Sequence, residues 1–183
     1  MSTKKQLNVK SLTVIAMMTA ILCVLAPFSI PIGDIPISAA TLVVYIAAVL
    51  LGTKRSLVCV GLYILIGLAG VPVFSGWKSG AAVIAGPTGG YLLGYLLIAL
   101  LTGLFLKIGK GKIPMMVLGM VLGTISCYAV GTIWLAHQLS LTAKAALWAG
   151  VIPFLPGDIA KIVVTVLIAV PTRKHLLRFI EGN

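Results

Sequence analysis

The stretch YLLGYLLIALLTGLFL, residues 91–106, contains no charged side chain and decides the fold class. Similar apolar runs lie on both sides of it along the chain. They occupy about residues 11–26, 38–51, 56–69, 115–135 and 145–170. A helix that crosses a bilayer takes about 20 apolar residues. The pattern therefore predicts six transmembrane helices.

The composition excludes the other broad classes of protein. Of the 183 residues, 60% are hydrophobic and 9% are charged, and the mean hydropathy is +1.17. A soluble domain has about 25% charged residues, and a disordered chain has low hydrophobicity. We therefore expect an all-α integral membrane protein whose residues 1–183 form a single transmembrane domain.

The basic residues predict how the helices are oriented. The net charge is +11, but the 14 Lys and Arg residues lie in short clusters between apolar runs, so nucleic acid is not expected as a partner. If six helices alternate across the membrane, eleven basic residues fall on the side of both termini. Only Lys78 and Lys144 fall on the other side, and Lys161 lies inside the last run. Because basic residues favour cytoplasmic loops, both termini are predicted to be cytoplasmic.

Two connections and one helix are predicted to be irregular. Residues 27–37, PFSIPIGDIPI, contain three prolines and are not expected to form a regular helix. Residues 70–90, GVPVFSGWKSGAAVIAGPTGG, are rich in Gly and Pro and carry one charge. Such backbone is tolerated at membrane depth where it lines a cavity, which predicts a re-entrant or lid-like loop between helices 3 and 4. Pro153 and the Pro156-Gly157 pair interrupt the last run and predict a broken sixth helix.

Asp158 and Lys161 are the only ionisable residues well inside an apolar run. Their spacing of three residues places both on one helix face, and the rise of about 1.5 Å per residue back from Thr172 places Asp158 in the outer half of the bilayer. One interpretation is a polar ligand site at a broken helix, reached from outside. The alternative is structural, with Asp158 capping the segment after the break and pairing with Lys161. We favour the first because a buried ion pair is a poor source of stability.

Two further motifs each have a functional interpretation and a purely structural one. The sequence GPTGGY at residues 86–91 lacks the Lys-Ser/Thr ending of a Walker motif, so we interpret it as a rigid turn that brings the loop close to a ligand. Tyr91 then offers its ring and hydroxyl, whereas the alternative for Tyr91 and for Trp77 is an anchor at the membrane interface. Ala16 and Ala20 are four residues apart and permit close approach of a partner helix, although alanine is common in this chain.

Catalysis finds no support in the sequence. His137 and His175 lie far along the chain from Asp158, and there is no carboxylate pair and no Ser-His-acid set. The three cysteines lie in different apolar runs, without the spacing of a disulfide framework or a metal site. We expect no metal, no cofactor and no enzymatic activity.

Three motifs, in this order along the chain, resemble the BioY family: GVPVFSG at residues 70–76, AGPTGGYLLGY at 85–95 and PFLPGDIAK at 153–161. Members of that family are the biotin-specific substrate-binding subunits, or S components, of energy-coupling-factor (ECF) transporters. The resemblance implies a six-helix bundle in the bacterial cell membrane that captures extracellular biotin with high affinity. It also implies a transmembrane coupling subunit and two cytoplasmic ATPases as partners. S components of this type dock on the coupling subunit through an A-x-x-x-A face of the first helix, which matches Ala16 and Ala20.

The same resemblance implies roles for individual side chains toward biotin. Asp158 is expected to accept hydrogen bonds from the ureido N–H groups, and Lys161 to donate to the ureido oxygen. Tyr91 and Trp77 are expected to contact the thiophane ring and the alkyl chain.

The remaining predicted contacts lie in the loop between helices 3 and 4. Lys78 is expected to meet the carboxylate of biotin, and Ser79 and Thr88 complete the predicted substrate-binding set. This chain differs from the family at residues 77–79, WKS, where the family is usually richer in glycine.

Four other functions stay open on the sequence alone. Two are also transport functions, a solitary ion-coupled vitamin carrier and an S component for another small vitamin. The other two are a small intramembrane enzyme and a structural subunit without a ligand.

Overall fold

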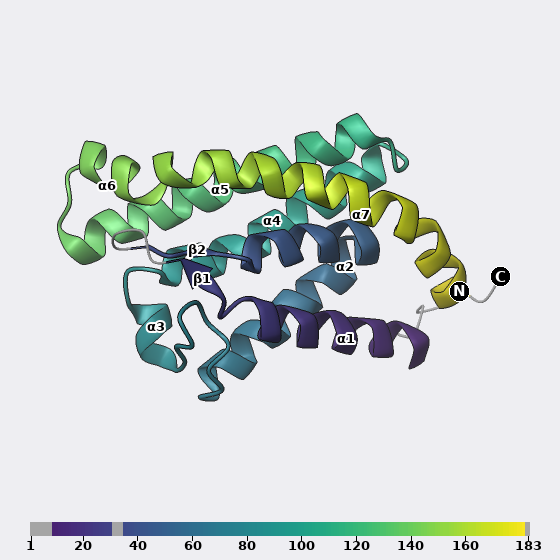
Figure 1. Cartoon of the computed structure of the whole chain (residues 1–183), viewed down its shortest axis with the longest axis horizontal. Coiled ribbons are helices and arrows are strands. Elements are labelled where there is room, and N and C mark those ends of the chain that lie inside the picture. Colours follow the sequence, from purple (N-terminus) through teal and green to yellow (C-terminus); the bar gives the residue numbers. More distant parts are fainter. Residues whose placement is uncertain (1–8, 31–34, 182–183) are drawn as a thin grey trace, which may run out of the picture.

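The computed structural model describes residues 9–30 and 35–181, which are mostly helical (Figure 1). Among the basic residues counted for topology, Lys4 and Lys5 lie outside the described residues, as do residues 31–34 of the proline-rich connection. The elements in chain order are α1 (Val9–Leu25), β1 (Ser29–Ile30), β2 (Ile37–Ser38), α2 (Ala40–Leu68), α3 (Ala81–Ala85), α4 (Gly89–Ile108), α5 (Ile113–Leu139), α6 (Ala143–Gly150), the 3-10 helix η1 (Ile152–Phe154) and α7 (Leu155–Glu181).

Helix α2 consists of two halves joined at Gly52. The backbone there has φ 72° and ψ 179°, a conformation that glycine adopts readily because it has no Cβ. In Figure 1 the first half runs from β2 toward the end of the bundle that carries both termini, and the second half runs back. The two halves of α2, together with α1, α4, α5 and the α6–α7 pair, give six long helical segments among the described residues. This arrangement confirms the predicted all-α membrane bundle. Helices α2, α4, α5 and the stretch from α6 through α7 are long and apolar enough to cross a membrane, and α1 is a shorter apolar helix.

Glycines allow α4 and α5 to pack closely at the centre of the bundle. A Cβ atom on Gly94 would lie 2.5 Å from Cys127 Sγ, and one on Gly123 would lie 2.9 Å from Ile98 Cα. Small residues at such contacts let the backbones of membrane helices approach each other and gain van der Waals packing. The α4–α5 pair is therefore a tightly packed support for the residues that it points into the bundle.

The connections at one end of the bundle are ordered against each other. The strands β1 and β2 form a short antiparallel hairpin in which Ser29 pairs with Ser38. Ser38 Oγ accepts a hydrogen bond from the N–H of Ala40 at 2.9 Å, which supports the start of α2. In the loop before α3, the N–H of Gly76 donates to the carbonyl oxygen of Pro27 at 3.0 Å. The predicted lid-like loop therefore packs on the proline-rich connection, at the end of the bundle opposite the termini (Figure 1).

The sixth helix is broken at Pro153, one of the two predicted interruptions, but not at the second, Pro156 and Gly157. The break falls at Val151 and η1, and α7 follows directly. Pro156 and Gly157 belong to the first turn of α7, where proline is tolerated because its missing N–H has no acceptor within the helix. The prediction of an interruption at Pro156 and Gly157 was therefore wrong. Asp158 lies inside the first turn of α7 rather than at the start of a new segment.

Candidate ligand-binding site

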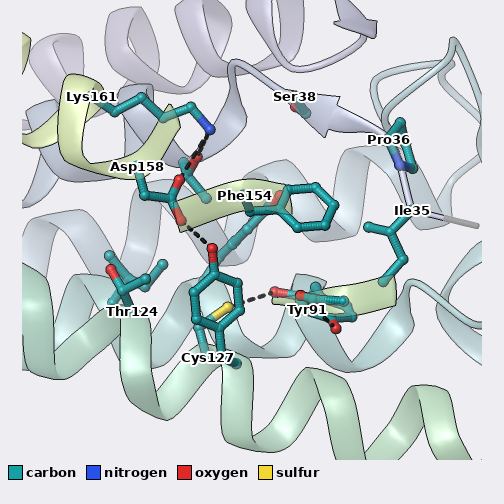
Figure 2. Close-up of a pocket in the computed structure, with 14 residues that line it drawn as sticks. Ile35, Pro36, Ser38, Tyr91, Thr124, Cys127, Phe154, Asp158 and Lys161 are labelled. Atoms are coloured by element: carbon teal, nitrogen blue, oxygen red, sulfur yellow. Dashed lines mark hydrogen bonds and ion pairs between the residues drawn. The ribbon is translucent and has the colours of Figure 1, made fainter. Parts of the chain in front are cut away.

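A cavity lies inside the bundle, between α2, α4, α5 and the start of α7, with strand β2 and the residues before it along one side (Figure 2). Counting its mouth, it contains about 450 Å³ of space not filled by protein atoms. The lining residues are mostly apolar or aromatic: Ile35, Pro36, Ser38, Thr41, Tyr91, Tyr95, Ile98, Thr124, Cys127, Tyr128, Gly150, Phe154, Asp158 and Lys161.

Asp158 and Lys161 form an ion pair in the wall of this cavity. Lys161 Nζ lies 3.2 Å from Asp158 Oδ1, and it also donates a hydrogen bond to Thr41 Oγ1 at 2.7 Å. The hydroxyl of Tyr128 donates to the second carboxylate oxygen of Asp158, Oδ2. Asp158 is only 6% exposed. Side chains from α2, α5 and α7 thus form one connected polar network inside an apolar bundle (Figure 2).

This network keeps hydrogen-bonding capacity for a ligand. A carboxylate accepts about four hydrogen bonds and an ammonium group donates three, whereas Asp158 accepts two here and Lys161 donates two. A ligand that presents N–H donors beside a carbonyl oxygen would match the remaining positions. The described residues contain no cluster of three His, Cys, Asp or Glu side chains that would hold a metal ion, so the network is the candidate polar site.

Tyr91 contributes its ring to the cavity wall, because its hydroxyl is already bonded to protein. That hydroxyl donates to the carbonyl oxygen of Gly150 at 3.1 Å and lies 3.3 Å from Thr132 Oγ1. A Cβ atom on Gly131 would lie 2.5 Å from the ring of Tyr91, and one on Gly150 would lie 2.1 Å from the hydroxyl. The side chain is 8% exposed. Tyr91 is therefore a packed wall residue and not an anchor at the membrane interface.

The other loop residues predicted for the site lie outside the cavity wall. Trp77 is 59% exposed, and its ring packs edge-on against Phe28 with the ring centres 5.4 Å apart. Lys78 is exposed, and Ser79 and Thr88 are partly exposed. None of the four predicted residues lines the cavity, so a ligand contact from any of them stays a prediction.

Ala16 and Ala20 are exposed on the surface of α1. Their neighbours Met17 and Ile21 are 60% and 43% exposed. This face of α1 is therefore accessible to a partner, while its docking role stays a prediction.

The sequence analysis missed the two residues that complete the polar network, Tyr128 and Thr41. Both carry a hydroxyl within or next to an apolar run, which is a signal that was available but shared by many other positions. It also missed Tyr95 and Phe154, which line the cavity as aromatic walls. An aromatic residue in an apolar run shows no preference between core, lipid and cavity, so only packing identifies these two.

Comparison with known proteins decides the family. The sequence profile of the BioY family matches residues 1–178. The chain belongs to the BioY family. This membership confirms the resemblance found in the three motifs, and it makes the protein a relative of multi-pass membrane transporters.

Members of the BioY family from bacteria and archaea are similar along most of the chain. Biotin transporter BioY2 of Lactococcus lactis is 38% identical over 158 residues, which cover 86% of each chain. Biotin transporter BioY of Thermotoga maritima is 37% identical over 156 residues, 85% of this chain and 91% of the relative. A crystal structure described as the S-component for biotin from an ECF-type ABC transporter is 34% identical, with a TM-score of 0.86, and the match covers 94% of this chain and 95% of the other.

Proposed function

We propose that this protein binds biotin in the cavity beside Asp158 and Lys161 and serves as the S component of an ECF-type ATP-driven transporter. The observation that carries the proposal is the network of Asp158, Lys161, Tyr128 and Thr41 in the wall of an apolar cavity. A buried charged network of this kind is expected to serve a ligand. The choice of biotin is supported by relatives that are described as biotin transporters and by the related S-component for biotin.

The chemistry of biotin matches the parts of this cavity. Its ureido ring presents two N–H donors and one carbonyl acceptor, which suit the spare acceptor positions of Asp158 and the spare donor of Lys161. Its thiophane ring and alkyl chain are apolar and suit the walls formed by Tyr91 and Phe154. Its carboxylate is proposed to lie toward the loop, with Lys78 as the predicted partner.

The binding assignment is tested by removing the charge of Asp158. In Asp158→Asn one carboxylate oxygen becomes an NH₂ group that cannot accept from a ureido N–H, so we expect biotin affinity to fall at least about tenfold, or about 1.4 kcal/mol. Titration with radiolabelled biotin in lipid nanodiscs measures the affinity. Ser126→Ala is the matched control on α5, because that hydroxyl bonds only to the carbonyl oxygen of Leu122 in its own helix. Unchanged affinity in folded Asp158→Asn protein would refute the assignment.

The proposed orientation places both termini in the cytoplasm and the cavity nearer the outside. The eleven basic residues predicted for one side include residues 54–55, 107–112 and 173–178. The cavity includes Ile35, Pro36 and Ser38 of the hairpin region, which lies at the end opposite the termini (Figure 1). Single cysteines are introduced at Lys78 and Lys174 in a variant whose three native cysteines are replaced by serine or alanine. Labelling in intact cells tests this orientation, with labelling from outside expected only at position 78.

The partner assignment is tested on the exposed face of α1. We propose that Ala16 and Ala20 contact a transmembrane coupling subunit that is assembled with two cytoplasmic ATPases. A leucine at Ala16 would prevent the close approach of a helix of the coupling subunit. Ala16→Leu protein is therefore expected no longer to co-purify with the coupling subunit and ATPases, while it still binds biotin. Met17→Leu is the control, because it keeps the side-chain volume on the same exposed surface. Biotin uptake without any coupling ATPase, abolished by an uncoupler, would instead indicate a solitary ion-coupled carrier.

A further inference from the structure

A second cavity, which the proposed function does not use, opens on the surface of α5 and α6. We call it the α5–α6 groove. Counting the space on its open side, it contains about 940 Å³ not filled by protein atoms, compared with about 450 Å³ for the cavity beside Asp158 counted in the same way. No charged or amide side chain lines it. Its residues are Ile125, Tyr128, Ala129, Thr132, Ile133, Ala136, Ala143, Ala146, Leu147, Val151 and Leu155.

The groove has the shape of a trough along α5. Ile133 and Leu155 are large and exposed, at 72% and 46%, whereas Ala129, Ala136 and Ala146 are small and contribute little side-chain volume. A trough lined by large exposed and small side chains suits a single flexible apolar chain. The bilayer supplies such chains to every exposed surface of a membrane-spanning helix.

The length of the groove matches one leaflet of a bilayer. Its lining residues on α5 run from Ile125 to Ala136, a distance of about 17 Å at a rise of about 1.5 Å per residue. The hydrocarbon core is about 30 Å thick, so one leaflet contributes about 15 Å of acyl chain. A groove that ended in the middle of a leaflet, or that crossed the whole bilayer, would not fit one acyl chain in this way.

The two ends of the groove differ in polarity, as the two ends of a phospholipid do. At the end near the α5–α6 connection, the exposed Lys144 lies in the first turn of α6 beside the lining residue Ala143 and supplies a positive charge there. The opposite end of the groove reaches Ile125 at the middle of α5, where the surroundings are apolar.

We propose that the α5–α6 groove is a binding site for one phospholipid, with an acyl chain in the trough and its phosphate beside Lys144. The site has a direct link to the biotin cavity, because Tyr128 lines both. Tyr128 therefore contacts both spaces, and its hydroxyl donates a hydrogen bond to Asp158 Oδ2. A chain in the groove therefore packs on the ring that positions the carboxylate of the polar network.

The experiment maps lipid contacts directly. Wild-type protein is placed in nanodiscs of phosphatidylcholine that contain a small fraction of phosphatidylcholine with a photoreactive diazirine midway along one acyl chain. After irradiation, digestion and mass spectrometry, we expect adducts on the groove residues at least fivefold above those on exposed α1 and α4 side chains such as Met17 and Leu100. Ala129→Phe fills the trough and should lower the groove adducts at least fivefold. Ala145→Phe, at an exposed α6 position outside the groove, should leave them unchanged.

Each outcome decides for or against the site. Adducts spread evenly over the lipid-facing helices, or groove adducts that persist in Ala129→Phe, would overturn the proposal and indicate ordinary fluid lipid. Native mass spectrometry of a dimer together with a groove free of adducts would overturn it in favour of a second copy as the occupant. If Ala129→Phe does not fold, Ala136→Phe replaces it, because Ala136 lies at the polar end of the same groove. Its adducts are then compared with the wild-type map by the same criterion.

Discussion

Replacing one member of the Asp158–Lys161 pair is predicted to lower the free energy of unfolding. Replacing both members is predicted to leave the free energy of unfolding nearly unchanged. The perturbation is a set of three variants, Asp158→Asn, Lys161→Met and the double variant. Lys161→Met leaves an ionised carboxylate that is 6% exposed, with only the hydroxyl of Tyr128 as a donor. The double variant leaves no charge among the described residues of the cavity wall.

The magnitude follows from the geometry of the pair. Two unit charges 3.2 Å apart attract each other by about 5 kcal/mol at an effective dielectric constant of about 20. Removing one partner of a buried pair costs about 3–5 kcal/mol, whereas replacing both by neutral groups is often close to neutral. For a chain of this size 1 kcal/mol corresponds to about 2–4 °C in Tm. Lys161→Met should therefore melt roughly 6–20 °C below the wild type, and the double variant should regain most of that loss.

The assay combines thermal unfolding in nanodiscs with biotin binding. The decisive pattern is a double variant that melts near the wild type but binds no biotin, because the pair then serves the ligand and not the fold. Lys174→Met removes an exposed lysine from the same helix and is the control for net charge. A double variant that is as unstable as Lys161→Met would refute the reasoning, since the pair would then contribute to folding in its own right.

Two further predictions concern the walls of the cavity. Tyr128→Phe removes a hydrogen bond to a buried charge, worth about 1.5–3 kcal/mol, and is expected to weaken biotin binding about tenfold or more in the same titration. Tyr63→Phe removes a buried hydroxyl without a partner among the described residues and should leave binding unchanged; equal losses in both variants would argue against a specific role for Tyr128. Gly131→Ala places a Cβ atom 2.5 Å from the ring of Tyr91 and should lower the free energy of unfolding by about 1–3 kcal/mol. In Gly61→Ala the new Cβ atom meets no described atom within 4 Å, so this variant should stabilise its helix slightly. A Gly131→Ala protein that melts at a higher temperature than Gly61→Ala would contradict the packing argument.

The charged pair of the site was predictable because its signal is local. An acid and a base three residues apart on a helix share a face whatever the rest of the chain does, so the Asp158–Lys161 pair was identified from spacing alone. The break at Pro153 was also predicted, but the expected interruption at Pro156 was wrong, because proline fits the first turn of a helix as well as it interrupts one. The loop around Trp77 was expected at the ligand because of its composition. Composition does not determine which way an exposed side chain turns, and Trp77 packs on Phe28 outside the cavity.

By itself, the amino-acid sequence determined the membrane class, the six helical segments and the charged pair, since run length, composition and helical spacing act within one segment of chain. Only the tertiary structure decided that Tyr128, 30 residues away, and Thr41, 120 residues away, complete the network around that pair. Which hydroxyl meets a buried charge depends on how the helices pack and rotate against each other. That outcome depends on close contacts such as Gly94 against Cys127, to which distant parts of the chain contribute together.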